Sequence, residues 1–362
     1  MGGFPSGSVH FRAWASALRA TNPRGRRLPY RLNGTRAWII TIVVGAAASY
    51  YGLIDPTFIA KQWGSLLATA SLYCATLIAI FQVKARLWPD NAGDTLFTGG
   101  FWYDIFNGGE LHPRTGLMFD WKHFNASRTG GMLTWTVIDL SFAALQYRQL
   151  GTLTSSMVIA VVFRLCIVWE YFHWENWFFE TLDGNHERFS FYNIYGFAAM
   201  MPHIWTLQTQ YLALHPVTLP RSQEIAVVAL FISGWALQHL VNRQKSLARE
   251  TAGECTIWGR KAKCLEATYQ TADGKTHRTV LLCSGWWGVM RHGNYAGTIL
   301  YDWASCLACG TGHIFPYAEA ILVTGLVIHR CLRDEARCRE KYGKTWDEYC
   351  RIVKWRIIPG IY

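Results

Sequence analysis

Charged residues are scarce in this chain. Lysine, arginine, aspartate and glutamate make up 16% of its 362 residues, whereas a soluble domain averages about 25%. Hydrophobic residues make up 51% and include 18 tryptophans, 17 tyrosines and 19 phenylalanines. Tryptophan and tyrosine are typical of the membrane–water interface, where an apolar ring carries a polar edge. The scarcity of charge argues against an ordinary soluble domain and indicates a membrane protein with polar loops.

Several common sequence signals are missing as well. Residues 1–36 are arginine-rich and lack a compact apolar core, so we expect no cleavable signal peptide. The 10 cysteines are scattered, which predicts small buried thiols, including Cys306 and Cys309, and no disulfide framework. Neither an HExxH motif nor a paired CxxC arrangement is present, so no metal site is expected.

Apolar segments suited to a bilayer recur along the chain. A membrane helix needs about 20 mostly apolar residues, or fewer where flanking groups reach the interface. This rule predicts an all-α, polytopic membrane bundle of about eight transmembrane helices. The expected spans are 37–54, 63–83, 132–147, 156–171, 195–214, 224–240, 295–309 and 314–328.

Basic residues are unevenly distributed between the connecting segments. Those at 55–62, 148–155 and 215–223 carry one basic residue each, whereas the N-terminal segment and the loops at 84–131 and 241–294 carry many. Cytosolic loops are the ones enriched in lysine and arginine. We therefore expect both termini in the cytosol, although the loop at 172–194 carries only Arg188. The net charge of +11 reflects this topology and predicts no nucleic-acid partner.

A short β-hairpin is expected in the loop before the last two spans. Residues 265–269 and 277–282 alternate apolar and polar side chains around a turn at Asp273 and Gly274. The charge pattern puts this hairpin in the cytosol.

The last 120 or so residues combine basic and aromatic side chains, which suits a phosphorylated ligand with stacking rings. His292 and Asn294 favour such a ligand, and the alternative is a belt of lipid-headgroup contacts. A second polar cluster follows the fourth span. Its Glu175, Asp183 and His186 are candidate proton donors, because an apolar setting raises a carboxyl pKa. The alternative is that these acids cap helices or face water.

Long motifs in the chain are familiar. Residues 281–297 (LLCSGWWGVMRHGNYAG), 329–349 (HRCLRDEARCREKYGKTWDEY) and 359–362 (PGIY) resemble the sterol reductase family, which includes C14 and Δ7 reductases. Residues 119–122 (FDWK), 139–144 (DLSFAA) and 206–212 (TLQTQYL) extend the similarity from about residue 28 to the C-terminus. Residues 306–317 and 257–263 favour the Δ7 branch.

The resemblance implies NADPH as the cofactor. It implies that Lys245 and Arg249 approach phosphate groups. The residues that it implies to line the nicotinamide side are Leu282, Trp287, Asn294 and Tyr295. The residues that it implies to complete the cofactor pocket are Asp334, Cys338, Lys341, Tyr342 and Tyr349. Two positions depart from the family pattern: Trp205 stands where a tyrosine is common, and Thr298 where an acid is common.

The expected reaction is reduction of a sterol ring double bond, the C7–C8 alkene of a 7-dehydrosterol, by protonation and hydride transfer. Three parts are expected: a cytosolic basic segment at 1–36, a bundle at 37–240 contributing the sterol pocket, and an NADPH-binding half at 241–362. The expected partners are a sterol from the bilayer, membrane lipids and other sterol-pathway enzymes. The expected location is the endoplasmic reticulum membrane, or the inner membrane in a bacterium.

Three alternatives stay open on the sequence. One is a C14 sterol reductase, and another is a sterol-binding protein without catalytic activity. The third is a membrane methyltransferase that uses S-adenosylmethionine, because the Arg291-His292-x-Asn294-Tyr295 pattern occurs there too. The phosphates of NADPH fit the cations Lys245, Arg249, Arg333 and Lys341 better than S-adenosylmethionine does.

Overall fold

The computed structural model describes residues 16–21, 27–270, 274 and 276–362. These residues pack as two compact units, divided between Leu219 and Pro220. We call them the N-terminal unit and the C-terminal unit and describe each by itself. The expected N-terminal segment at 1–36 lies partly outside the described residues, and the expected three-part division stays a prediction.

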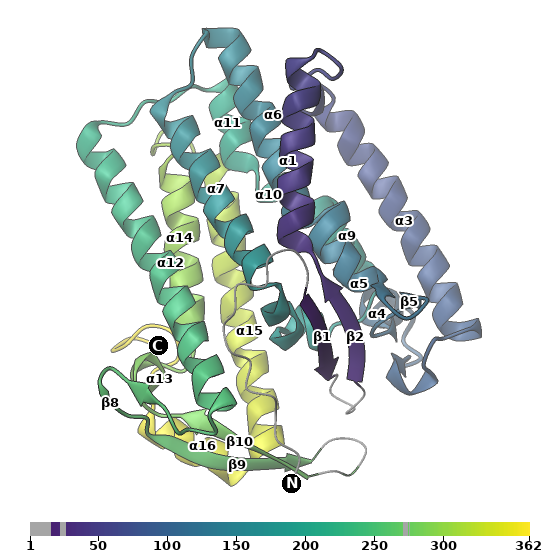
Figure 1. Ribbon diagram of the computed structural model, residues 1–362, viewed down its shortest axis with the longest axis vertical. Coiled ribbons are helices and arrows are strands. Elements are labelled where there is room, and N and C mark those ends of the chain that lie inside the picture. Colours follow the sequence, from purple (N-terminus) through teal and green to yellow (C-terminus); the bar gives the residue numbers. More distant parts are fainter. Residues whose placement is uncertain (1–15, 22–26, 271–273, 275) are drawn as a thin grey trace. The chain divides into compact units, whose positions relative to one another are not determined.

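The N-terminal unit is mainly helical (Figure 1). Its longer helices are α1 (Gly34–Tyr50), α3 (Trp63–Leu87), α6 (Met132–Leu150) and α7 (Ser155–His173). Its shorter helices are α2 (Phe58–Lys61), α4 (Phe101–Asn107), α5 (Trp121–Phe124), α8 (Leu182–Asn185), α9 (Phe191–Tyr195), α10 (Met201–Ile204) and α11 (Leu207–Leu214). Single turns of other helix types are η1 (Ala92–Asp94), η2 (Asn125–Thr129), η3 (Glu175–Glu180) and η4 (Gly196–Met200).

The strands of the N-terminal unit form small antiparallel pairs at one end of its helices. The longest pair is β1 (Ser16–Thr21) with β2 (Arg27–Leu32), where Ser16 lies opposite Leu32. The short pairs are β3 (Thr95–Leu96) with β4 (Gly109–Glu110), and β5 (Arg114–Thr115) with β6 (Phe119–Asp120).

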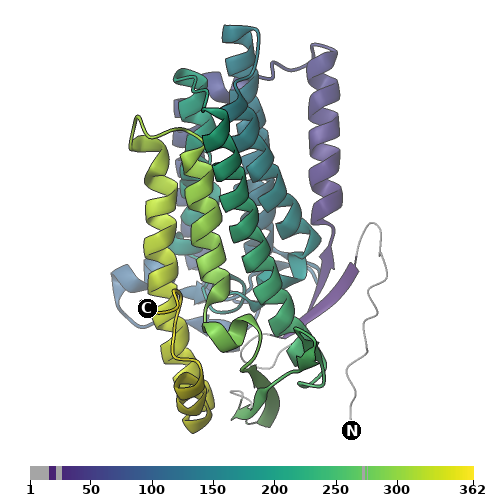
Figure 2. The same cartoon turned by 90° about the vertical axis from the view of Figure 1, so that its left-hand side faces the viewer.

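The C-terminal unit contains three long helices. They are α12 (Arg221–Glu250), α14 (Gly293–Leu307) and α15 (Ala318–Tyr342), and α14 lies between the other two (Figure 2). The single turn η5 (Phe315–Tyr317) precedes α15. The small elements α13 (Trp286–Val289) and α16 (Lys344–Ile352) and the strands gather where α12 and α15 end (Figure 1).

The expected hairpin is confirmed as a structure. Strand β9 (Cys264–Gln270) pairs antiparallel with β10 (Thr276–Leu282), with Ala267 opposite Thr279. A second small pair joins β7 (Thr256–Ile257) to β8 (Arg260–Lys261). Part of the turn between β9 and β10 lies outside the described residues. The cytosolic location of the hairpin stays a prediction.

Four helices in the described part of the chain are long and apolar enough to cross a membrane. They are α3, α7, α12 and the continuous segment Phe315–Tyr342 that contains α15. All eight expected spans coincide at least in part with helices, so the helical class is correct, whereas crossing by every segment stays a prediction. All 10 cysteines are free, and Cys306 and Cys309 are buried as expected.

The fifth expected span, at 195–214, is wrong as one continuous helix. It breaks into the π-helical turn η4, the short α10 and then α11. Trp205 and Thr206 separate α10 from α11, and the Thr206 hydroxyl donates to the carbonyl of Pro202 at 2.7 Å. Hydropathy does not detect such interruptions, because apolar residues continue through them.

Helices α12 and α14 approach closely through glycine. A Cβ atom on Gly234 would lie 2.7 Å from the Leu300 Cβ, and one on Gly297 would lie 2.6 Å from the Gly234 carbonyl oxygen. Small residues let membrane helices pack backbone against backbone. This contact fixes the start of α14, which carries Asn294 and Tyr295, against α12.

Candidate functional site

Three cations crowd one end of the C-terminal unit. Lys341 in the last turn of α15 lies with its Nζ 3.7 Å from the centre of the Tyr269 ring and 5.2 Å from that of Tyr342. The charges of Arg249 and Arg337 oppose that of Lys341. Like charges so close together are costly unless an anion neutralises them. This basic cluster of Arg249, Arg337 and Lys341 therefore suits a ligand with phosphate groups.

An aromatic and thiol-lined surface adjoins the basic cluster. Tyr349 is buried with Ala267 and Leu281 of the hairpin, and Cys338 and Tyr342 pack against the same group. The Tyr349 hydroxyl donates to the Trp287 carbonyl at 3.3 Å. Burial raises the pKa of Tyr349 above its ordinary value, so the phenol stays protonated.

The segment 282–287 joins this surface to α12. Leu282 is buried against Ala248, and Trp287 packs on the same cluster. The Trp287 indole donates to the Val241 carbonyl at 2.8 Å. Lys245 lies on this part of α12, where the neighbouring Gln244 accepts from the Trp286 amide at 2.9 Å. Several predicted cofactor residues are thus brought together by direct contacts.

The first turn of α14 faces the acidic side of α15. The Tyr295 hydroxyl donates to Asp334 at 2.6 Å, and Arg337 pairs with the other oxygen of that carboxylate at 2.8 Å. Asn294 carries a buried side-chain oxygen that has no hydrogen-bond partner in the described residues. Such an atom costs free energy unless a ligand or water bonds to it. The start of α14 therefore offers polar capacity beside the basic cluster.

Glu335 of α15 forms ion pairs with two arginines next to this site. Arg291 donates to its Oε1 at 2.7 Å and Arg356 to its Oε2 at 2.8 Å, which ties the C-terminal residues to α15. His292 stacks on Tyr295 at 5.2 Å, and burial lowers its pKa to about 4, so it is neutral. His292, Cys331 and Glu335 offer ligand atoms within 4.8 Å of one another. The guanidinium groups already satisfy the carboxylate and oppose a cation there.

The predicted proton donors lie in the N-terminal unit. Glu175 is buried, lies 3.1 Å from His123 and 3.0 Å from Arg128 as an ion pair, and accepts a hydrogen bond from the Gly34 amide at 2.9 Å. Burial alone raises the pKa of Glu175, but His123, Arg128 and the Gly34 amide outweigh it and hold the pKa below the usual value. Its surroundings thus favour a carboxylate, which opposes the expected role of proton donor at neutral pH.

Asp183 and His186 lie on α8 and directly after it. Asp183 is buried, whereas His186 is half-buried. The Asp183 charge acts on Lys122, which is fully buried. Their role as proton donors stays a prediction.

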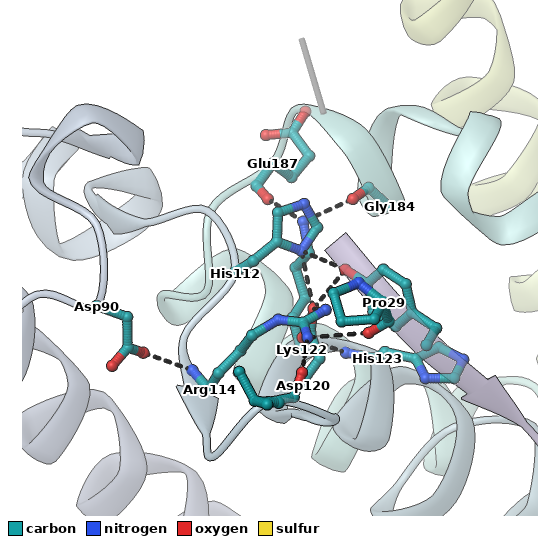
Figure 3. A network of polar contacts seen from close by, with 11 residues as sticks. Pro29, Asp90, His112, Arg114, Asp120, Lys122, His123, Gly184 and Glu187 are labelled. Atoms are coloured by element: carbon teal, nitrogen blue, oxygen red, sulfur yellow. Dashed lines mark hydrogen bonds and ion pairs between the residues drawn. The ribbon is translucent and has the colours of Figure 1, made fainter. Parts of the chain in front are cut away.

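Sequence reasoning missed the polar network around Lys122 (Figure 3). The Lys122 ammonium donates to the Gly184 carbonyl at 2.8 Å and the Glu187 carbonyl at 3.0 Å. Asp120 accepts from Tyr30 at 2.8 Å and contacts the His112 Nδ1 at 2.9 Å. Burial lowers the pKa of Lys122 to about 8, against the pull of Asp120 and neighbouring acids, so Lys122 remains charged at neutral pH. We call Lys122, Asp120, His112 and Tyr30 the buried charge network.

The two positions that depart from the family pattern have plain structural roles. Trp205 is buried, stacks on Trp135 at 6.1 Å and accepts a hydrogen bond from Arg164 through its carbonyl. Thr298 donates to the Asn294 carbonyl one helical turn earlier, at 3.1 Å. Tyr269 was missed as a neighbour of Lys341, although its place on an alternating strand was foreseen.

Long apolar helices and a ring-lined basic cluster define an integral membrane protein with a site suited to a phosphorylated cofactor. Residues 15–362 match the model of the Ergosterol biosynthesis ERG4/ERG24 family. The chain therefore belongs to this family of sterol reductases.

Individual relatives agree with the family match. The 7-dehydrocholesterol reductase of Xenopus laevis is 41% identical over 344 residues, which cover 95% of this chain and 72% of the relative. The 7-dehydrocholesterol reductase of Danio rerio is 38% identical, with the same coverage. The Delta(14)-sterol reductase of Methylotuvimicrobium alcaliphilum is 35% identical over 98% of this chain and 81% of the relative. A sterol reductase requires a reductant, and the basic cluster is the candidate site for it.

Proposed function

We propose that this protein reduces the C7–C8 double bond of a 7-dehydrosterol with NADPH. The observation that carries the cofactor assignment is the basic cluster of Arg249, Arg337 and Lys341 beside the rings of Tyr269 and Tyr342. The relatives named 7-dehydrocholesterol reductase support the sterol assignment. The methyltransferase alternative loses its support, because the family match spans residues 15–362.

The residues of the C-terminal unit fit NADPH. The cations would hold its phosphates, and Tyr342, Trp287 and Leu282 would hold its rings. The unpartnered Asn294 oxygen would accept a hydrogen bond from the cofactor. Lys245, Tyr295, Asp334, Cys338 and Tyr349 complete the proposed site. When bound, NADPH supplies the hydride.

The chemistry requires a proton before the hydride. A ring alkene without an electron-withdrawing substituent is not electrophilic, so a protein acid first protonates it to a carbocation, which then accepts the hydride. The proton and the hydride saturate the double bond, and NADPH becomes NADP⁺. A dry, positioned pocket favours this sequence. The surroundings of Glu175 favour its carboxylate form, so we propose Asp183, with His186, as the proton source; this role requires Asp183 to take up a proton before the sterol reacts.

The proposed setting follows the charge pattern of the loops. The cofactor site faces the cytosol, both termini are cytosolic, and the sterol enters from the bilayer. The membrane is the endoplasmic reticulum in a eukaryote or the inner membrane in a bacterium. Other sterol-pathway enzymes are proposed neighbours.

Purified protein in nanodiscs tests the proposal. With NADPH and 7-dehydrocholesterol, mass spectrometry should detect the 7,8-saturated sterol, and no product should form with S-adenosylmethionine. A sterol with a C14–C15 alkene is the matched second substrate, because a relative is named Delta(14)-sterol reductase. Turnover of that sterol alone would move the function to the C14 branch. Sterol binding without turnover of either substrate would contradict the proposed enzyme.

A further inference from the structure

The N-terminal unit contains a groove whose lining includes none of the proposed cofactor or proton-donor residues. Its volume is about 750 Å³, and α3, α4 and α9 line it. Small-molecule sites in proteins measure roughly 300–1,000 Å³. The groove is therefore large enough for an elongated lipid.

The shape of the groove follows from residue size along α3. Ser71, Ala75 and Ala79 follow one another at four-residue spacing, so their small side chains lie on one helix face, and all three line the groove. Phe101 of α4 lines it as well. So does Phe191 of α9, whose ring stacks on that of Tyr195 at 5.2 Å. Because α3 is a candidate membrane span, the groove lies on a helix suited to contact with lipid.

One end of the groove is cationic. Arg86, in the last turn of α3, donates through Nη1 to the Gln82 carbonyl at 2.9 Å and to its Oε1 at 2.6 Å. Its guanidinium lies 4.2 Å from the centre of the Phe97 ring. Arginine carries five N–H donors. Its Nε and Nη2 form no hydrogen bond within the described residues, so they are available to a ligand.

The other polar groups near Arg86 are already engaged. The Gln82 amide donates to Asp104, Gly108 and Ser190. The Arg86 charge acts on Asp104, but the Asp104 carboxylate accepts hydrogen bonds from Thr98 and from the Gly99 amide. Lys84 in the same turn pairs with Asp90 and Glu110. Arg86 is thus the cation left to meet an anion at this end of the groove.

The length of the groove fits a lipid of one membrane leaflet. From Ser71 to Arg86, α3 rises roughly 22 Å at about 1.5 Å per residue. Half of the hydrocarbon core measures about 15 Å. We propose that the groove binds an anionic glycerophospholipid, with its phosphate on Arg86 and one acyl chain along Ser71, Ala75 and Ala79. A neutral sterol hydroxyl would bring no negative charge to the guanidinium.

Native mass spectrometry of the full chain, titrated with phosphatidylglycerol, tests the proposal. Arg86→Gln should weaken binding about tenfold, which corresponds to about 1.4 kcal/mol. Arg86→Lys should retain part of the affinity. Ala79→Phe fills the groove from an exposed position and should abolish binding without unfolding the protein. The matched control is Arg148→Gln, because Arg148 pairs with Asp55 at 2.8 Å outside the groove.

The outcomes separate the candidate occupants. Loss of phosphatidylglycerol binding in both groove variants, with unchanged unfolding temperature and sterol turnover, supports the proposal. Equal binding of phosphatidylcholine, or no effect of either variant, overturns it. Competition by a sterol that Ala79→Phe abolishes and Arg86→Gln leaves intact would assign the groove to sterol instead.

Discussion

The buried charge network and the basic cluster differ in how their charges are compensated. In the network, the Lys122 ammonium bonds to backbone carbonyls, and Asp120 accepts from Tyr30 and contacts His112. In the cluster, Lys341 lies against rings and is repelled by Arg249 and Arg337. When the protein itself compensates buried charges, removal of one partner leaves the others unpaired and destabilises the fold. The repulsion on Lys341 persists although Arg337 is paired with Asp334, which favours a ligand that brings further negative charge to the cluster.

Lys122→Met should produce the largest effect if the network is architectural. The change leaves Asp120 and the carbonyls of Gly184 and Glu187 without their shared cation. Breaking a buried pair costs about 3–5 kcal/mol, so we expect a large drop in unfolding temperature, measured by tryptophan fluorescence. The control is Lys61→Met, which removes an exposed bridge to Asp55. A stable Lys122→Met protein that merely binds NADPH poorly would contradict the architectural role of the buried charge network.

Glu175→Gln should give the next largest loss of stability. The substitution removes the charge that Arg128 and His123 contact, and removal of one partner from a buried ion pair costs about 3–5 kcal/mol. We place the loss below that for Lys122→Met, because glutamine keeps an oxygen that can accept from the Gly34 amide. We expect a lower unfolding temperature but persistent sterol turnover per folded molecule, because the ionised Glu175 holds no proton to donate. Loss of turnover with NADPH binding intact would instead assign the proton donor to Glu175.

Acid should destabilise the N-terminal unit through its buried carboxylates. The folded-state pKa of Glu175 lies below the usual 4.5. A depressed pKa contributes stability that is present above the unfolded-state value and is lost as pH falls through the folded-state value. The unfolding temperature should therefore stay level towards about pH 5 and fall below about pH 4.5. Glu175→Gln should flatten this fall, and an unchanged slope would contradict the assignment.

Lys341→Met should weaken NADPH binding about tenfold and leave the unfolding temperature unchanged. The side chain is exposed and is opposed by like charges, so its loss relieves repulsion in the free protein and removes an attraction for phosphate. Isothermal titration with NADPH measures the effect. Arg351→Met on α16 is the control, because Arg351 is exposed in the same unit. Equal losses of NADPH affinity in both variants would mean that the cluster acts only through general surface charge.

The same contrast explains which features could be predicted from the sequence. Helices α3, α7 and α12 are continuous apolar segments, and alternation predicted β9 and β10. The basic cluster was predicted in part: the resemblance implied Arg249 and Lys341, whereas Arg337 was not among the implied cofactor residues. The resemblance, not the pattern, supplied Cys338.

The buried charge network was not predictable, because its bonds join distant residues. Lys122 reaches Gly184, 62 positions away, and Tyr30 reaches Asp120, 90 positions away. No local period marks such pairs, and the loop at 84–131 suggested only cytosolic charge. The break at Trp205 and Thr206 was not predicted for a related reason, since hydropathy averages over so short an interruption.

Tyr295→Phe should give the smallest effect and should sharpen the boundary between anchoring and chemistry. The change removes one hydrogen bond to Asp334, which keeps Arg337, and preserves the ring that stacks on His292. A hydrogen bond contributes about 1 kcal/mol, so we expect roughly a fivefold rise in KM for NADPH with kcat unchanged.

The matched control for Tyr295→Phe is Tyr317→Phe. The Tyr317 hydroxyl donates to the Gly310 carbonyl at 3.0 Å, beside the opposite end of α14 from Tyr295. Its loss should leave both kinetic constants unchanged. Interactions made only in the transition state lower kcat, whereas uniform binding alters KM. A fall in kcat for Tyr295→Phe with constant KM would therefore show that the Tyr295–Asp334 pair stabilises the transition state and does not merely bind the cofactor.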